Sequence, residues 1–513
     1  MTQFRQNGKS RTFACNPTVD SARWAGHERR LLPVVAVQPR QLVVDTPLGR
    51  NAFTLVGFSG HEAISELFRF QLDLVAPNEA IPFEQIVGQP VTVTLQLPSG
   101  IARKFHGIVS RFSQGARNPT TTLYRAEIVP WLWLLTRTTD SRIFQRISVP
   151  DILREVLAGT PVQASFELQE SYFARDYCVQ YRETDFNFVS RLMEEEGIFY
   201  FFRHEDDKHV LVVADGPATR SSLGTFVFDR TAAQDRVFDW EKTQELRSGR
   251  VTLRDHEFEL PQSPIEATAT IPDTVQAGQV THRLTLGGNE RLELYDYPGE
   301  WAERFDGVGP GGEDRRADLL NILPAAPQTA AIRVQEEAEQ SLIIRGGSTC
   351  RALESGRTFT LQGHFNADGQ YLLTSVQHIA TQAAQGGQTS GFEYTNSFTC
   401  IPESVRFRPV RVTPKAVVPG TQTAIVVGPA GAQIYTDKYG RVKVQFFWDR
   451  EGKKDEHSSC WIRVAQPVGG EGHGFFWLPE VDDEVIVAFE EGDPDRPLIV
   501  GRVYNASDAP PRT

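Results

Sequence analysis

The residues that come closest to a catalytic pattern lie at positions 256–260. His256 and Glu257 begin as the His-Glu pair of a zinc hydrolase begins, and Leu260 stands where the second histidine is required. Two histidines four residues apart on a helix reach one metal ion together, so a single imidazole cannot form this ligand pair. We expect an exposed strand here in place of a zinc site.

Two further segments resemble catalytic motifs only in part. Gly8-Lys9-Ser10 ends like a phosphate-binding loop, but Gln3 stands where the first glycine is needed and no strand precedes it. The Gly-Phe-Ser-Gly-His run at 57–61 misses the nucleophile elbow by one position. We interpret the first segment as tail sequence and expect a β-turn at the second.

Structural roles explain the acidic and aromatic residues more simply than ligand or metal binding does. The acidic runs at 482–484 and 490–493 lack the ligand spacing of a calcium loop, so we expect solvated hairpin turns. His364 has no Cys, Asp or His partner pattern nearby, which favours a structural role over metal binding. The 32 Phe and 8 Trp are dispersed through alternating segments, as in a barrel core. We predict no catalytic residue, no metal site and no cofactor.

Composition limits the class of protein. The 513 residues carry 53 Lys and Arg against 65 Asp and Glu, a net charge of −12, which argues against general nucleic-acid binding. The five cysteines are odd in number and contain no C-x-x-C pair, so a disulfide framework or zinc cage is not expected. No apolar run approaches ~20 residues, so we predict no transmembrane helix. The apolar run at 31–37 after two arginines mimics a signal peptide, but it is short and contains Pro33.

Strands should dominate the first half of the chain. Residues 68–74 and 91–97 alternate apolar and polar side chains, the pattern of strands with one wet face in an antiparallel sheet. Two helices interrupt them: one after a Ser148 cap, ending near Gly159, and one from a Thr184 cap to Gly197. Three glutamates near the end of the second helix oppose its dipole, so tertiary contacts must hold that end. A buried strand should follow at 198–202.

The second half begins with a less regular stretch. Residues 308–328, rich in Gly, Pro and charge, predict a surface insertion or linker, and 329–340 a helix. Strands resume near 359–361 and 371–373, and prolines punctuate an extended linker over 401–419. Short strands at 442–446, 460–464, 484–489 and 498–503 then suit a small Greek-key barrel of the OB type.

A string of residues in this last segment resembles the VgrG family of spike proteins. Looser matches lie at 180–186, 195–200, 295–299 and 350–353. The resemblance covers about residues 41 to 508 and implies that the C-terminal string is structural. The string comprises Tyr435, Asp437, Tyr439, Gly440, Arg441, Trp448, Asp449, Arg450, Trp461, Arg463, Gly492, Asp493, Pro494, Arg496, Pro497, Gly501, Tyr504 and Asn505.

The resemblance implies a fold and a set of partners. The fold would be mainly β with a minor α/β portion: tail-hub, tube-like β-barrels followed by a small OB barrel. Such proteins are homotrimers whose six similar barrels can dock on a hexameric Hcp-like tube among baseplate proteins. We expect strands 442–447 and 460–464 to stabilise the trimer. The family's β-helical needle, often capped by a PAAR-type tip protein, is not visible after residue 508, so docking of a tip protein and direct membrane piercing by this chain stay open. The resemblance implies a role in joining the Hcp-like tube to the puncturing tip and in delivering effectors.

The expected organisation follows from these segments. It comprises an N-terminal extension at 1–40, a first barrel region at 41–140, a mixed α/β hub region at 141–245, a second barrel region at 246–400, a linker at 401–419, an OB domain at 420–508, and a tail at 509–513 where a needle would start. We predict a non-enzymatic hub of a type VI secretion system, assembled in the cytoplasm and exported by the machine without a cleaved signal. The alternatives are the hub of a contractile phage or extracellular injection particle, and a hub-linked peptidoglycan hydrolase, for which no acid pair in an added domain is apparent.

Overall fold

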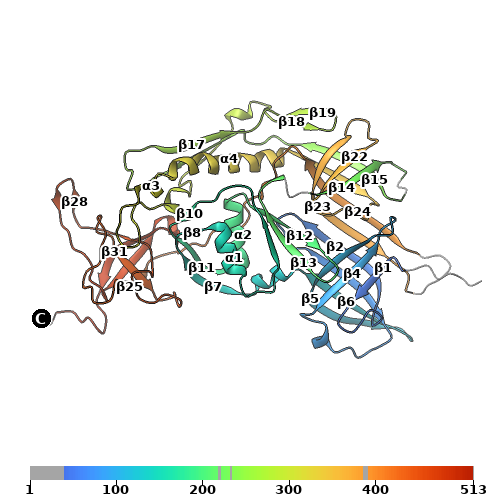
Figure 1. Ribbon diagram of the computed structural model, residues 1–513, viewed down its shortest axis with the longest axis horizontal. Helices are drawn as coiled ribbons and strands as arrows, with labels where there is room; N and C mark the ends of the chain where they lie inside the picture. Colours follow the sequence, from blue (N-terminus) through green and yellow to red (C-terminus); the bar gives the residue numbers. More distant parts are fainter. Residues whose placement is uncertain (1–39, 218–220, 232–233, 385–390, 512–513) are drawn as a thin grey trace, which may run out of the picture. The chain divides into compact units, whose positions relative to one another are not determined.

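A computed structural model describes residues 40–217, 221–231, 234–384 and 391–511. The N-terminal extension, the phosphate-loop-like segment, the signal-like run and Cys15 lie outside these residues. The described chain is built mainly from strands, with a few helices between them (Figure 1). Among the described residues, no helix is both long enough and apolar enough to cross a bilayer.

The first six strands form one barrel-like sheet. In the order β1-β4-β5-β6-β3-β2 each strand pairs with the next in antiparallel fashion, and Gln382 hydrogen-bonds to Leu42 and Val56 where β1 meets β2. Strands lie at 68–74 and 91–97 as predicted, and the apolar side chains of β3 point inward. The wet face expected for β4 is wrong, because Thr92 and Thr94 are buried together with its apolar residues. The strands are β1 Leu42–Asp45, β2 Thr54–Ala63, β3 Arg69–Ala76, β4 Pro90–Gln96, β5 Ala102–Arg117 and β6 Thr122–Val129.

Six later strands close a second barrel. The sheet runs β23-β22-β14-β15-β21-β24, and β24 pairs back onto β23. Strands β2 and β23 pair along Gly57–Ala63 and Thr381–Ser375, so one twelve-stranded sheet runs through both barrels (Figure 1). The strands of the second barrel come from the sequence before residue 246 and after residue 341. They are β14 Ser222–Phe228, β15 Arg236–Gln244, β21 Leu342–Ser348, β22 Thr358–Gln362, β23 Gly369–Thr381 and β24 Glu393–Pro402.

A mixed α/β segment, here called the central region (residues 139–214), lies between these strands in sequence. Helix α1 (Val149–Leu157) begins after Ser148, whose hydroxyl accepts from the Asp151 amide, and α2 (Asp185–Glu195) begins after Thr184 in the same way. Both predicted helices and the buried strand after α2 are confirmed. The strands are β7 Thr139–Phe144, β8 Ile147–Ser148, β9 Ala164–Glu167, β10 Ala174–Arg175, β11 Cys178–Thr184, β12 Phe199–His204 and β13 His209–Ala214.

Residues 250–341 form a small sheet covered by a long helix. Helix α4 (Ile322–Ser341) packs on β17 and β16, and a short α3 (Arg316–Leu319) precedes it. The prediction of a linker up to 328 is therefore wrong at its end. Pro324 falls in the first turn, where its missing N–H costs nothing, and buried Ile322, Ala325 and Ala326 anchor that turn. The strands are β16 Arg250–Asp255, β17 Ile265–Thr270, β18 Thr274–Ala277, β19 Val280–Arg283 and β20 Glu293–Asp296.

Two local expectations are wrong. Residues 57–61 lie inside β2, because Gly57 and Gly60 leave room for Asp73 and Phe70 on the neighbouring strand. Residues 256–260 form a turn after β16 in place of an exposed strand, and Glu257 in that turn is buried. The Asp255 carboxylate holds the turn by accepting from the amides of His256, Trp301 and Ala302.

The last segment is a five-stranded barrel, here called the C-terminal barrel. Its sheet order is β26-β25-β30-β31-β27, with a bridge between Val442 and Ile462. The strands predicted at 442–446, 460–464, 484–489 and 498–503 are confirmed, although the second is shorter than expected. The strands are β25 Gln422–Val427, β26 Lys443–Phe446, β27 Arg463–Val464, β30 Glu484–Phe489 and β31 Pro497–Val503, with a hairpin of β28 Gly469–Gly470 and β29 His473–Gly474.

Candidate functional site: the junction of the central region and the C-terminal barrel

Part of the C-terminal string shapes turns within its own barrel. The Asp437 carboxylate accepts from the amides of Tyr439 and Arg441 around Gly440, whose φ of +69° suits glycine. Asp449 accepts from the amides of residues 451 and 452, and Asn505 from those of 507 and 508. These side chains fix the loops that join the strands.

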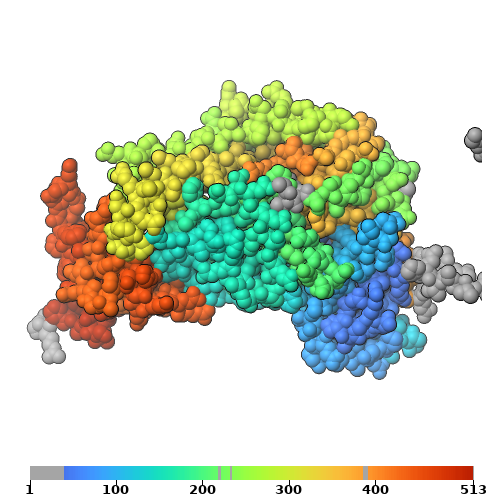
Figure 2. Space-filling model, in the orientation of Figure 1, coloured from blue at the N-terminus to red at the C-terminus, as the bar shows by residue number. Residues whose placement is uncertain are grey.

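Another part of the string reaches out of the barrel toward residues 306–310. The guanidinium of Arg441 donates two hydrogen bonds to Asp306, at 2.8 and 2.9 Å, and a third to Asp437 at 2.7 Å. Burial alone would lower the pKa of Arg441, but these carboxylates outweigh it and raise the pKa. Tyr435 and Trp461 donate to the carbonyls of Pro310 and Gly309, at 2.9 and 2.8 Å. Figure 2 shows this contact as the yellow segment against the orange-red barrel.

Two more members of the string contact the central region. The Trp448 indole lies 5.7 Å from the Tyr181 ring and donates to Gln422, which in turn donates to the Tyr181 hydroxyl. Arg450 donates to Asp140 at 2.6 Å. Because Arg450 is largely exposed, this ion pair contributes little stability, whereas the two rings are half-buried.

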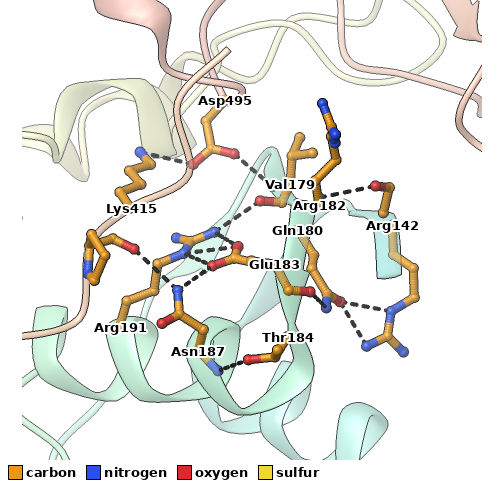
Figure 3. A network of polar contacts seen from close by, with 12 residues as sticks. Arg142, Val179, Gln180, Arg182, Glu183, Thr184, Asn187, Arg191, Lys415 and Asp495 are labelled. Atoms are coloured by element: carbon orange, nitrogen blue, oxygen red, sulfur yellow. Dashed lines mark hydrogen bonds and ion pairs between the residues drawn. The ribbon is translucent and has the colours of Figure 1, made fainter. Parts of the chain in front are cut away.

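A lysine whose side chain is only 19% exposed joins three segments at the centre of the junction. Lys415, in the segment between β24 and β25, lies 2.6 Å from Asp493 and 3.0 Å from Asp495. Asp495 also accepts from the Val179 amide of β11 at 2.6 Å (Figure 3). Burial would lower the pKa of Lys415, but the two carboxylates raise it well above its ordinary value. The prediction of solvated turns is therefore wrong for Asp493, whose side chain is only 10% exposed.

A second ion pair fixes the helix behind this contact. Arg191 of α2 binds Glu183 of β11 at 2.9 Å and donates to the Val179 carbonyl at 2.9 Å (Figure 3). Asn187 donates both to Glu183 and to the Pro414 carbonyl, next to Lys415. Helix α2 is thus tied to the strand and to the segment that lead into the C-terminal barrel.

The acidic end of α2 is held by tertiary contacts, as the sequence predicted. Arg175 pairs with Glu195 at 2.7 Å and with Glu196 at 2.5 Å. Glu194 accepts from the amides of Val412 and Thr413. These contacts offset the unfavourable position of three acids at the negative end of the helix dipole.

The rest of the string is divided between backbone and surface roles. Gly492 has φ +75°, and its carbonyl accepts from the Val418 amide. Arg496 binds Glu490 at 2.6 Å, Pro494 is buried, and Pro497 opens β31 opposite Phe489. The remaining members are Tyr439 and Arg463, which lie near Phe258, Gly501 in β31, and the exposed Tyr504.

Sequence reasoning missed the partners of the string. Asp306, Tyr181 and Asp140 stand far from the string in sequence, and Lys415 lies in the linker before it. Tyr181 belongs to the looser family match at 180–186, but nothing in the sequence indicates that any of the four contacts the string. Within the described residues, His, Cys, Asp and Glu side chains form no group of three that could hold a metal ion. The arrangement links the C-terminal barrel to the central region and to residues 306–310 through hydrogen bonds and ion pairs.

Comparison with known proteins gives the family. A family model described as phage tail baseplate hub (GPD) matches residues 61–384, and one described as the type VI secretion system/phage-baseplate injector OB domain matches residues 424–504. The type VI secretion system spike protein VgrG1a of Pseudomonas aeruginosa is 39% identical over 92% of this chain and 70% of its own length. The chain belongs to the VgrG spike family.

Two further comparisons set the limits of this result. VgrG1b of the same organism is 38% identical over 93% of this chain, which spans 62% of that protein's length. A solved Escherichia coli structure, described as a type VI secretion component similar to phage T4 tail proteins gp27 and gp5, covers 90% of this chain and 99% of its own with a TM-score of 0.59 at 22% identity. This likeness shows that the two chains share a fold.

Proposed function

We propose that the chain is a structural, non-enzymatic hub of a type VI secretion system that joins an Hcp-like tube to the puncturing tip. The observation that carries the proposal is the single sheet that runs through two six-stranded barrels, tied to an OB domain by a buried junction. A protein that transmits a contraction stroke needs such continuity more than it needs a catalytic site.

The two barrels support a homotrimer docked on a hexameric ring. Three copies supply six similar barrels, so a sixfold tube could meet six similar surfaces while the tip keeps threefold symmetry. Family membership supports this arrangement. Baseplate proteins are the further partners that we propose, and a PAAR-type tip protein or effector would dock beyond the OB domain. We also propose assembly in the cytoplasm and export by the machine without a cleaved signal.

An exposed apolar surface of the C-terminal barrel suits contact with the other two copies. Phe475, Phe476 and Trp477 are 49%, 68% and 62% exposed, beside Val468 and Tyr504. In the segments 442–447 and 460–464, where we expected trimer contacts, every residue of β26 is buried within one chain, whereas Phe447 is 65% exposed. We therefore place the trimer contact of the OB domain on this aromatic surface.

Light scattering of the purified chain tests the oligomeric proposal. We expect the mass of a trimer, and a monomer for Phe476→Asp combined with Trp477→Asp. Phe365→Asp, which changes an exposed aromatic residue (82% exposed) of the second barrel region, is the matched control and should remain trimeric. A monomeric parent chain that also fails to bind Hcp rings in a pull-down would contradict the hub proposal.

A phage tail hub is the second candidate, and the match to the baseplate hub model favours it. VgrG1a and VgrG1b, at 39% and 38% identity over more than nine tenths of the chain, are type VI spike proteins, which favours secretion. Binding to Hcp rings rather than to a phage tube protein would separate the two. Peptidoglycan release by the purified chain, abolished by one carboxylate substitution, would contradict a non-enzymatic role.

A further inference from the structure

Strand β20 exposes apolar side chains on both of its faces. All four of its residues, Glu293–Asp296, are exposed, and so are the residues on either side of them. Successive side chains of a strand point to opposite faces, so neither face of β20 is covered. Four large side chains, here called the β20 surface, are between 41% and 57% exposed: Leu292, Leu294, Tyr295 and Tyr297. Single exposed apolar residues are common, but a contiguous group marks an interaction surface.

The outer edge of β20 is also open. The sheet order is β17-β16-β20, and among the described strands β20 pairs with β16 alone. Edge strands of proteins are usually shielded by charged side chains or by a covering segment. The two charges of β20 are bound within the chain, because Glu293 accepts from the Thr252 hydroxyl and Asp296 lies 3.5 Å from Arg333. The leucines and tyrosines are left to face a partner.

The strand is held in place although it is exposed. The Gly299 amide donates to the Arg254 carbonyl at 2.9 Å, and Trp301, two residues further on, is fully buried. A side chain at position 299 would collide with the Trp301 ring, so the backbone packs closely on it. An apolar surface that is already ordered binds a partner without a large entropy cost.

The trimer that we propose needs more surface than the C-terminal barrel offers. The aromatic surface there comprises five residues. A stable interface usually takes about 20–30 residues from each partner. The hub part of the chain must therefore supply further contacts between copies.

The β20 surface adjoins the aromatic surface of the C-terminal barrel. Tyr297 and Arg463 line the same cavity. Val464, the next residue in the chain, lines the groove that contains Phe475 and Trp477. A copy that covers the aromatic surface would therefore reach β20.

The segment between β24 and β25 extends the exposed area on the other side of α4. Arg333 of α4 binds Asp296, as described above, and Glu336, one turn further along α4, lies 3.2 Å from Arg411. The residues on either side of Arg411 are both valine, and they are 45% and 76% exposed. Apolar side chains thus flank this row of ion pairs on both sides, which suits a surface that a large partner covers.

We infer that a second copy of this chain covers the β20 surface, so that contacts between copies extend from the C-terminal barrel along residues 292–297. The inference rests on the homotrimer proposed above. Tyrosine suits such a contact, because its ring buries a large area and loses little conformational freedom.

Hydrogen exchange of the full chain tests the inference without changing β20. The reference is Phe476→Asp combined with Trp477→Asp, for which we expect a monomer. The peptide that covers residues 292–297 should exchange roughly tenfold more slowly in the parent trimer than in this monomer, because a partner shields its amides. The turn at 117–121, in the first barrel, is the internal control and should exchange equally in both. Equal exchange of residues 292–297 in a trimeric parent and in the monomer would overturn the inference and leave the homotrimer standing.

Substitutions in β20 give a second test. Leu294→Asp combined with Tyr295→Asp should raise the concentration at which the trimer dissociates by at least roughly tenfold, because two charges would be buried without partners. Val87→Asp combined with Ile101→Asp, two exposed apolar residues of the first barrel, is the matched control. Light scattering over a dilution series measures dissociation, and circular dichroism checks that each variant folds.

The outcomes separate this inference from the homotrimer proposal. A β20 variant that dissociates no more readily than the control variant would overturn the inference alone, and the β20 surface would then belong to a different partner. A parent chain that is monomeric at every concentration would overturn both.

Discussion

Three histidines in contact with the first barrel should make its local stability fall in mild acid. The Nε2 atom of His209 accepts the amide hydrogen of Trp131 at 2.9 Å, so Nδ1 carries the proton and donates to Nδ1 of His106, also at 2.9 Å. The Nδ1 atom of His204 accepts the amide hydrogen of His106 at 3.0 Å. Protonating His209 Nε2 or His204 Nδ1 would place a second N–H donor opposite the backbone amide that each now accepts from.

The size of the effect follows from the pKa values. Burial lowers the pKa of His204 to about 4 and that of His209 to about 2, against 6.5 in the unfolded chain. A base with a lowered folded pKa gives stability that is present above pH 6.5 and is lost as pH falls toward the folded value. Between pH 7 and pH 5 each histidine should therefore cost about 2 kcal/mol, at roughly 1.4 kcal/mol per pH unit per proton.

The total stability curve will not show this loss clearly. Burial raises the pKa of Glu257, Glu303 and Glu339 to about 8, 8 and 7, and such acids stabilise the fold as pH falls over the same window. Glu62 contributes little to the change in stability between pH 7 and pH 5. The ion pair with Arg103 holds the pKa of Glu62 near 2 despite burial, so the stability that this carboxylate adds is lost only as pH falls below about 4.5. The difference between parent and variant isolates the histidine.

We therefore predict that His209→Gln reduces the loss between pH 7 and pH 5 by about 2 kcal/mol. Hydrogen exchange of the peptide that contains Trp131, corrected for intrinsic rates, measures the local free energy of opening. His61→Gln is the control: a hydrogen bond to Glu66 raises the pKa of the half-exposed His61, so its removal should shift the pH dependence in the opposite direction. An equal loss in the parent and in His209→Gln would refute the reasoning.

Three further changes should show what holds the junction together. Gly492→Ala should destabilise the chain by roughly 1–3 kcal/mol in a urea titration, because its φ is +75° and the new methyl would lie 2.8 Å from Val417. Gly431→Ala is the control: its φ is +84° but nothing lies near the new methyl, so its cost measures the backbone strain without a steric clash. Lys415→Met should cost about 3–5 kcal/mol by leaving Asp493 and Asp495 buried without a cation, and adding Asp493→Asn should recover part of the melting temperature; no recovery would contradict this account. Thr184→Ala should cost about 1 kcal/mol through loss of the α2 cap, whereas Thr184→Ser should cost much less.

The parts of the fold that were predictable follow from local physics. Strand β3 shows strict alternation, and α1 and α2 begin at a Ser and a Thr whose hydroxyls cap the first turn. These signals depend on neighbours in sequence, so they survive whatever the tertiary context. The C-terminal string located the OB domain for a different reason, because its residues form a family pattern.

The parts that were missed depend on residues that meet only after folding. Gly57 and Gly60 look like turn residues, yet a Cβ at Gly60 would lie 2.3 Å from Phe70 on the adjacent strand. Nothing near Glu257 indicates that its carboxyl is buried. Arg441 and Asp306 are 135 residues apart, and neither shows in sequence that it needs the other. The sequence therefore indicated the junction residues of the C-terminal barrel, such as Arg441, but not the residues that they contact.

The pairing of β2 with β23 affects how the two barrels respond to load. Seven consecutive residue pairs join them, so backbone hydrogen bonds between two neighbouring strands connect the two barrels. A force along the strands loads these hydrogen bonds in shear, where they resist together, and does not peel them apart one at a time. Bending one barrel must therefore twist the other. Heating should melt both in a single cooperative transition, because the two barrels form one stiff unit and not two independently unfolding domains.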